Sequence, residues 1–218
     1  AVAAALRFAT EEGAPRLFLI TSTQPEEGKS STALALAQNM ARRGHSVLLV
    51  DADLRKPSFR AARDDIGVTR LLTTEDRVRD HVAATQFDNL FLLPSGPLPP
   101  NPADLLSTPR FGTVLEECRH EFDTVIVDAP PILGLADAPL LAAACRDVLF
   151  VVEAGRTRTR PAIDALHRLE ATGAHLLGAV LTKATMTASG YGYYSYNYGA
   201  ALRGQEERIT LIPHQSDD

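Results

Sequence analysis

The stretch LFLITSTQPEEGKSSTALALA, residues 17–37, decides the fold class of this chain. A short apolar run, 17–22, leads into a polar loop that ends in Gly28, Lys29 and Ser30, and a helical pattern follows. A loop between a strand and a helix is the setting of a phosphate-binding loop, because the amides there point at phosphate oxygens. We expect Gly28 to allow close approach of the backbone, Lys29 to reach the β and γ phosphates, and Ser30 to offer its hydroxyl to Mg²⁺.

The loop departs from the usual pattern G-x-x-x-x-G-K-[ST], since Thr23 stands where the first glycine belongs. A Gly-Lys-Ser triplet alone is weak evidence, and an ordinary helix N-terminus would account for it. The flanking strand and helix, together with two later strand ends that carry aspartates, favour nucleotide binding.

Those aspartates follow two further apolar runs. SVLLVDAD, 46–53, carries Asp51 and Asp53, and DTVIVDAP, 123–130, carries Asp128. Ligands of an open parallel sheet sit outside the carboxyl ends of its strands. Three carboxylates beside a phosphate loop are therefore placed to hold Mg²⁺ and to orient a nucleophile. As an alternative, Asp51 or Asp53 caps a following turn.

Strands and helices alternate along the chain. Six runs are apolar at consecutive positions, which is typical of strands covered on both faces: 16–22, 46–53, 89–95, 123–130, 147–155 and 176–182. Helical patterns occupy 29–44, 109–122 and 160–173. The pattern predicts an α/β P-loop NTPase fold, with a doubly wound, mainly parallel sheet and helices on both faces. The proline-rich segment 93–106 is predicted as a rigid connecting loop.

Composition limits the classes of protein that need to be considered. The chain has 218 residues and 45% hydrophobic residues, which fits one large α/β domain. A net charge of -5 argues against nucleic acid as a partner. No apolar run approaches the roughly 18 residues of a membrane helix. Cys118 and Cys145 form no CxxC pair, so we expect two half-buried reduced thiols instead of a zinc site or a disulfide.

The periodic pattern ends after Lys183. We expect a domain at 1–186 and a flexible C-terminal tail at 187–218. All the tyrosines of the chain lie within 190–199, as Tyr191, Tyr193, Tyr194, Tyr196 and Tyr198. Taken alone, this cluster is also consistent with a low-complexity segment or an edge strand.

The ordered set of motifs resembles the bacterial tyrosine kinases (BY-kinases), from about residue 6 to 198. The similar segments are TSTQPEEGKSS, SVLLVDADLRKP, VIVDAPP, the proline-rich LLPSGPLPPNPADLLSTPRF and the tyrosine cluster. The resemblance implies an ATP-dependent kinase that phosphorylates its own tyrosines, with the tail of one subunit entering the site of its neighbour. It implies a role in the synthesis and export of capsular polysaccharide or exopolysaccharide.

The resemblance also assigns roles to residues, and implies ATP, ADP and Mg²⁺ as ligands. Asp51 is the candidate that activates the tyrosine hydroxyl, whose ordinary pKa is about 10. Arg55 either neutralises phosphate charge or forms a surface ion pair. The implied catalytic residues are Lys29, Asp51 and Asp53; the implied metal ligands are Ser30, Asp53 and Asp128; the implied nucleotide-binding residues are Gln24, Pro25, Glu26, Glu27, Gly28, Lys29, Ser30, Ser31 and Arg55; and the implied phosphoacceptors are the five tyrosines.

The implied partners are a second copy of the chain, a membrane-spanning polysaccharide co-polymerase or activator, fused or separate, and a cognate tyrosine phosphatase. The implied location is the cytoplasm, at the inner face of the bacterial plasma membrane. The chain begins with Ala1 instead of methionine, which would fit a kinase domain cut from such a fusion.

Two features depart from the family pattern. Ala1 and Ala4 replace the Glu and the first Arg of an E-x-x-R-x-x-R motif that ends at Arg7. We therefore expect a monomer or weak oligomer, with impaired phosphorylation between subunits. Thr182 stands where an Asn near the nucleotide base is usual, and Lys183 is expected to be a solvated charge. The segment RTRTR, 156–160, is expected to be a solvated loop or, alternatively, a docking patch.

Three other functions compete with the kinase. A ParA/MinD-type ATPase would carry a lysine at the position of Gln24, and a metal-cluster carrier would need a CxxC pair. A catalytically dead nucleotide-binding scaffold stays open, although Lys29 and the three aspartates argue against it.

Overall fold

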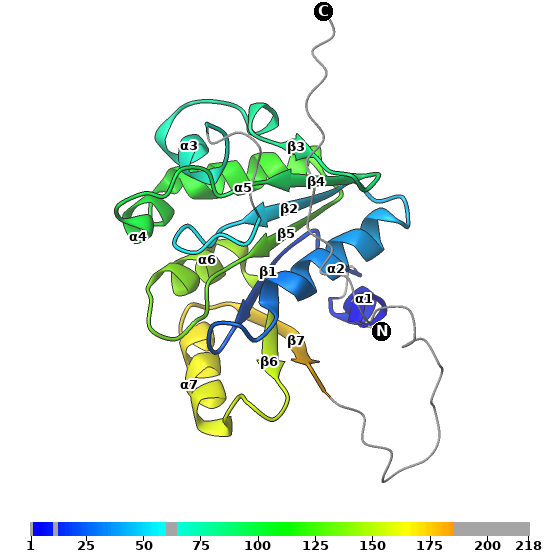
Figure 1. The fold of residues 1–218 in the computed structure, drawn as a ribbon, viewed down its shortest axis with the longest axis vertical. Coiled ribbons are helices and arrows are strands. Elements are labelled where there is room, and N and C mark those ends of the chain that lie inside the picture. The colour runs from blue at the N-terminus through cyan, green and yellow to red at the C-terminus, as the bar shows by residue number, and fades with distance from the viewer. Residues whose placement is uncertain (1, 11–12, 60–64, 185–218) are drawn as a thin grey trace, which may run out of the picture.

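The computed structural model describes residues 2–10, 13–59 and 65–184. Its centre is a seven-stranded sheet in the order β3-β4-β2-β5-β1-β6-β7 (Figure 1). Every neighbouring pair is parallel except β3 and β4. The strands are β1 Leu17–Ser22, β2 Val47–Asp51, β3 Ala83–Ala84, β4 Leu90–Leu93, β5 Thr124–Asp128, β6 Asp147–Glu153 and β7 His175–Thr182. The predicted α/β class and mainly parallel sheet are confirmed.

The central strands are buried on both faces. All six residues of β1 are buried, and successive side chains enter different cores. Leu17 and Leu19 belong to one apolar cluster, whereas Phe18 and Ile20 belong to the other. This explains why the strands are apolar at consecutive positions, because each face of the sheet is covered by helices.

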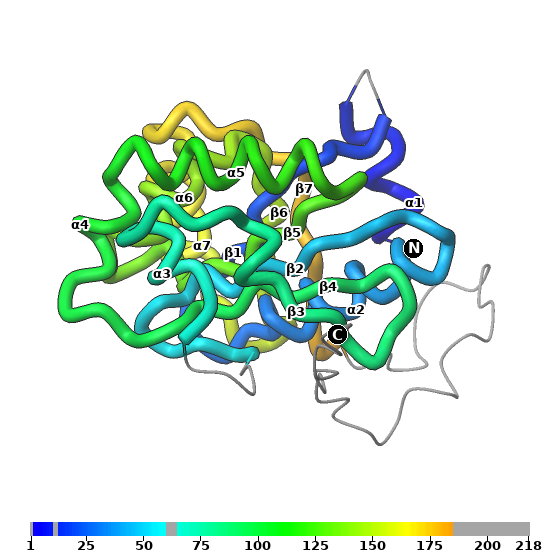
Figure 2. The backbone as a smooth tube through the Cα atoms, turned by 90° about the horizontal axis from the view of Figure 1, so that it is seen from above, coloured from blue at the N-terminus to red at the C-terminus, as the bar shows by residue number. Residues whose placement is uncertain are grey.

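Helices of different parts of the chain cover the two faces. On one face, α1 packs beside α2, as Figures 1 and 2 show, and both contribute to the core that contains Phe18. Helices α3 to α7 contribute to the core that contains Leu17. The α-helices are α1 Val2–Ala5, α2 Lys29–Ala41, α3 Val68–Thr73, α4 Pro102–Leu106, α5 Pro109–Glu121, α6 Asp137–Cys145 and α7 Thr159–Glu170, and the 3₁₀ helices are η1 Leu6–Phe8 and η2 Val78–Asp80.

The proline-rich segment 93–106 is only partly a loop. Its second half forms α4, so the prediction of a connecting loop was wrong there. Pro102 is the first helical residue, a position where its fixed φ suits the helix and its missing N–H costs no hydrogen bond. Proline therefore begins this helix where it was expected to prevent one.

The two cysteines are free, as expected, but both Cys118 and Cys145 are buried instead of half-buried. Burial raises the pKa of both thiols, that of Cys118 to about 12, so neither is a reactive thiolate at neutral pH. Over the described ranges, no helix combines the length and apolar character that crossing a membrane requires.

Candidate active site

The loop between β1 and α2 has the backbone of a phosphate-binding loop. Gly28 precedes the helix in the left-handed region (φ 92°), where a side chain would be strained. A Cβ at this position would also lie 3.4 Å from the Thr182 methyl group. Because the cap residue is a glycine, no side chain of its own covers the amides of the first helical turn. Those amides and the helix dipole favour an anion.

Lys29 is the first residue of α2, and its ammonium lies over the carboxyl ends of the strands. Nζ is 3.5 Å from Asp53 Oδ2 and 3.5 Å from Ser30 Oγ, and the residue is 8% exposed. The Ser30 hydroxyl is 2.8 Å from that of Ser58. Ser58 was not predicted as a site residue, since a serine several positions beyond a strand end belongs to no motif.

The sheet register brings the strand-end aspartates together. Strands β2 and β5 are neighbours, and Asp51 is the direct ladder partner of Asp128. Strand β1, which leads into the phosphate loop, lies on the other side of β5. The three carboxylates and Lys29 therefore meet at one edge of the sheet, as parallel strands of this order require.

Asp51 is fully buried, and backbone amides surround its carboxylate. Oδ1 accepts the N–H of Asp53 (3.2 Å), and Oδ2 accepts those of Ser58 and Phe59 (both 2.8 Å). Burial, with the Asp128 charge adding, raises its pKa to about 8, although the three amides oppose the shift. In this conformation Asp51 holds the segment after β2, and its role as a catalytic base stays a prediction.

Asp128 is equally buried but is unsatisfied. Neither carboxylate oxygen has a hydrogen-bond partner among the described residues. Burial raises its pKa to about 6, while the nearby Lys29 charge opposes the shift. A buried carboxylate without partners is costly, so this position suits a hydrated cation.

The donor set fits Mg²⁺ in particular. Within the described part of the chain, no group of three or more acidic, His or Cys side chains is arranged to hold a metal alone. Mg²⁺ does not need such a cage, because it usually keeps several waters and uses one or two carboxylates together with substrate phosphates. Ser30, Asp53 and Asp128 are the residues that would hold it.

Arg55 forms an ion pair in this conformation. Its Nε and one terminal nitrogen contact the two oxygens of Asp137, at 2.6 and 3.0 Å. Asp137 is the buried first residue of α6, where a carboxylate also complements the helix dipole. The ion-pair alternative for Arg55 is therefore the observed arrangement, and phosphate binding stays a prediction.

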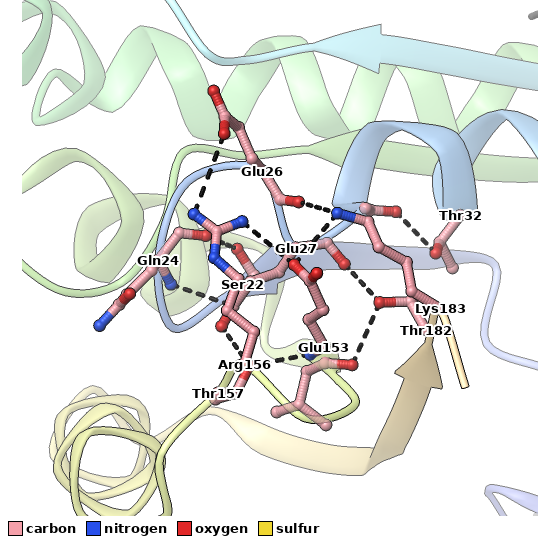
Figure 3. Close-up of polar contacts among 12 residues, drawn as sticks. Ser22, Gln24, Glu26, Glu27, Thr32, Glu153, Arg156, Thr157, Thr182 and Lys183 are labelled. Atoms are coloured by element: carbon pink, nitrogen blue, oxygen red, sulfur yellow. Dashed lines mark hydrogen bonds and ion pairs between the residues drawn. The ribbon is translucent and has the colours of Figure 1, made fainter. Parts of the chain in front are cut away.

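Contacts from β6 and β7 hold the phosphate loop from the side (Figure 3). Glu27 is buried, and its carboxylate accepts the Gln24 N–H (2.9 Å) and the Thr157 hydroxyl. The Thr182 hydroxyl donates to the Glu27 carbonyl (2.6 Å). The Lys183 ammonium donates to the Glu26 carbonyl (2.8 Å) and to the Glu153 carboxylate (3.1 Å).

These contacts refine two expectations. Lys183 is exposed, as expected of a solvated charge, but two acceptors also hold its ammonium. Within 156–160, Arg158 and Arg160 are exposed, but Thr157 contacts the phosphate loop and Arg156 pairs with Glu153 (3.1 Å). A pattern of strands and loops could not reveal this, since the Thr157–Glu27 contact joins positions 130 residues apart.

A cavity of about 480 Å³ lies beside this loop. Its lining includes Gly28, Ser31, Thr182 and Lys183, together with residues of α1 and α2. Ser31 is exposed and lines this cavity, and its role in nucleotide binding stays a prediction. No contact that bears on ligand binding is found for Pro25. The tyrosine cluster, the predicted boundary at 186/187 and Ala1 lie outside the described residues.

The fold and this site place the chain in the class of P-loop NTPase folds, which bind nucleotides. Residues 25–166 match the AAA domain family. MinD from Pyrococcus horikoshii shares the fold, with a TM-score of 0.62, 22% identity and coverage of 76% of this chain and 69% of that one.

Proteins with higher sequence identity to this chain indicate its family within this class. Tyrosine-protein kinase YwqD of Bacillus subtilis is 38% identical over 193 residues, which is 87% of this chain and 81% of YwqD. The crystal structure of the chimerical protein CapA2B2 superposes with a TM-score of 0.75 at 33% identity, and the match covers 82% of this chain and 80% of that one. The chain belongs to the bacterial tyrosine-protein kinase family, which confirms the resemblance seen in the motifs.

Proposed function

We propose that this chain is an ATP-dependent tyrosine autokinase that phosphorylates the tyrosines of 190–199 and so regulates the synthesis and export of a capsular polysaccharide or exopolysaccharide. Membership of the tyrosine-protein kinase family supports the enzyme class. The observation that carries the proposal is the meeting of Lys29 and the unsatisfied carboxylate of Asp128 beside a glycine-ended loop.

The chain's own groups supply binding and orientation for ATP. Amides of the loop 24–31 receive the phosphate oxygens, and the Lys29 ammonium neutralises charge on the β and γ phosphates. Ser30, Asp53 and Asp128 would hold Mg²⁺, which when bound would supply further charge neutralisation at the phosphates. Lys29 is already paired with Asp53 at 3.5 Å, so the carboxylate also fixes the lysine side chain.

The acceptor is the phenol of a tyrosine from a neighbouring subunit. Its oxygen bonds to the γ phosphorus, the bond from that phosphorus to the β–γ bridging oxygen breaks, and ADP leaves. The phenolic proton passes to a carboxylate, for which Asp51 is the candidate in its ionised form; because burial raises its pKa to about 8, this role also requires that form to be stabilised when substrates bind. Because three backbone amides now occupy Asp51, this role requires the Ser58–Phe59 segment to move when substrates bind.

The wider setting follows from the family. The partners are a membrane-spanning polysaccharide co-polymerase or activator and a cognate tyrosine phosphatase, and the chain acts in the cytoplasm at the inner face of the plasma membrane. Phosphorylation adds close to two negative charges per tyrosine, so neighbouring phosphates repel one another. We expect full phosphorylation to release the segment and loosen the assembly.

The test is to incubate the chain with Mg²⁺ and ATP and to map phosphate by tandem mass spectrometry. Phosphate on tyrosines of 190–199 is the expected result. A variant with all five tyrosines changed to Phe is the control, and it should take up no phosphate in this segment. Phosphate found only on other residues would contradict the proposed acceptor, and binding of ATP without any transfer would favour the nucleotide-binding scaffold.

A further inference from the structure

Four residues outside the phosphate-loop motif form one connected group against that loop, which we call the P-loop strap: Glu153, Thr157, Thr182 and Lys183 (Figure 3). They come from the end of β6, the turn after it, the end of β7 and the residue that follows β7. Three of them contact the loop. Glu153 contacts Thr157 and Lys183 and is the ladder partner of Thr182.

We propose that Lys183, held by Glu153, is a positioning residue for the nucleotide, and that it acts through the main chain of the phosphate loop. The inference rests on the proposed function only in that ATP binds in this loop.

The backbone that Lys183 contacts is strained. Glu26 has a positive φ of 68°, which is uncommon for a residue other than glycine and costs free energy. Such a conformation persists only where the surroundings hold it. The contact from Lys183 Nζ to the Glu26 carbonyl oxygen, at 2.8 Å, holds this residue directly.

Two successive peptide planes are fixed in the same way. The Lys183 ammonium donates a hydrogen bond to the carbonyl oxygen of Glu26, and the Thr182 hydroxyl donates one to the carbonyl oxygen of Glu27 (2.6 Å). In a trans peptide the C=O and N–H point in opposite directions, so the N–H groups of Glu27 and Gly28 are turned away from the strap. Consecutive amides presented in this way form the anion-binding surface of a phosphate loop.

The strap is braced by its own contacts. The Glu153 carboxylate accepts hydrogen bonds from Lys183 and Arg156 (both 3.1 Å), and its N–H donates to the Thr157 hydroxyl (2.8 Å). These cations lower the pKa of Glu153, in the first place through the hydrogen bond from Lys183. Thr157 in turn holds the Glu27 carboxylate, which also binds the Gln24 N–H inside the loop.

Loss of the Lys183 cation therefore loosens the amides that receive phosphate. Those amides contact ATP before and during the transfer alike, so the loss falls on KM and leaves kcat nearly unchanged. A lysine that only filled the surface would change neither constant.

The experiment compares Lys183→Met, Lys183→Arg and, as a matched control, Arg119→Met. Arg119 is a half-exposed cation in a surface ion pair with Glu116 at 3.2 Å, on α5. Direct ATP titration and autophosphorylation rates are measured for each. We expect Lys183→Met to raise the Kd and KM for ATP about five-fold with kcat within about two-fold, as loss of a partly exposed charged hydrogen bond implies. Lys183→Arg and Arg119→Met should stay within about two-fold of the wild type.

Glu153→Gln tests whether Glu153 acts through Lys183. If Glu153 acts by holding Lys183, the double variant binds ATP no more weakly than Lys183→Met alone. Additive losses would overturn the proposal, as would an unchanged Kd for Lys183→Met. Because the Kd is measured without phosphate transfer, a chain that binds ATP but transfers no phosphate refutes the proposed function and still decides this inference.

Discussion

At the scale of single residues, the site combines two buried carboxylates in opposite states. Asp51 accepts three backbone amides, whereas Asp128, its partner across the ladder, accepts none among the described residues. Burial raises the pKa of both. The Asp51 carboxylate holds the segment after β2 in place, whereas the Asp128 carboxylate is available to a ligand.

Asp51 makes stability depend on pH. Its pKa is 3.8 for the free side chain and about 8 in the fold, so between these values the folded state keeps a proton that the unfolded state has lost. The free energy of unfolding then falls as the pH rises, by up to about 1.4 kcal/mol per pH unit. Denaturant titrations of wild type and Asp51→Asn at about pH 6, 7 and 8 test this. The Asp51→Asn curve should fall less steeply; parallel slopes would contradict the assigned pKa.

The role of the Thr157 hydroxyl can be tested separately. Thr157→Val keeps the shape but leaves the Glu27 carboxylate and the Glu153 N–H each without one partner. We expect a loss of about 1–2 kcal/mol in stability and a several-fold higher KM for ATP. Thr157→Ser keeps the hydroxyl and should restore KM. Equal KM values for Thr157→Val and the wild type would show that this hydroxyl does not control the conformation of the phosphate loop.

At the scale of elements, the sequence predicted the strands well because consecutive apolar residues mark strands buried on both faces. The helices 29–44, 109–122 and 160–173 were also found, within a few residues of α2, α5 and α7. Helices α3, α4 and α6 and the two-residue strand β3 were missed. Helix α3 and strand β3 are too short to show a period, α4 begins at a proline within a proline-rich run, and α6 is short and uniformly apolar. The motif predicted the loop and the aspartates, but Ser58 and the P-loop strap depend on tertiary contacts that no local pattern encodes.

The junction before α3 is a sensitive element. Gly67 has φ 127°, and a Cβ there would lie 2.5 Å from Pro94 O and from Gly96 N. Gly67→Ala should therefore cost about 3 kcal/mol or more. Gly112, inside α5, has open space around the same position, so Gly112→Ala should stabilise by about 0.5–1 kcal/mol. Thermal denaturation of both variants checks the pair, and similar shifts in Tm would refute the packing argument.

At the scale of the whole molecule, we propose that the N-terminal segment controls how copies of the chain meet. Helix α1 packs on α2 through Ala3, whereas Ala4 is exposed and carries no charge for a neighbouring subunit. Changing Ala1→Glu and Ala4→Arg together should restore the charged contacts implied by the family motif. We expect a larger species in light scattering and faster autophosphorylation that increases with protein concentration. Unchanged size and rate would show that these positions do not limit assembly.

The proposed function requires this phosphate loop to transfer phosphate from ATP to tyrosine. The most direct measurement is the intact mass of the full chain after incubation with Mg²⁺ and ATP, beside a Lys29→Met control that keeps the fold but lacks the ammonium now placed 3.5 Å from Asp53. We predict added phosphates on the wild type, located on tyrosine, and none on Lys29→Met. Two results would contradict the account. One is equal phosphate on both proteins; the other is no phosphate on a chain that binds ATP, carries the Ala1→Glu and Ala4→Arg changes and is supplied with a membrane activator.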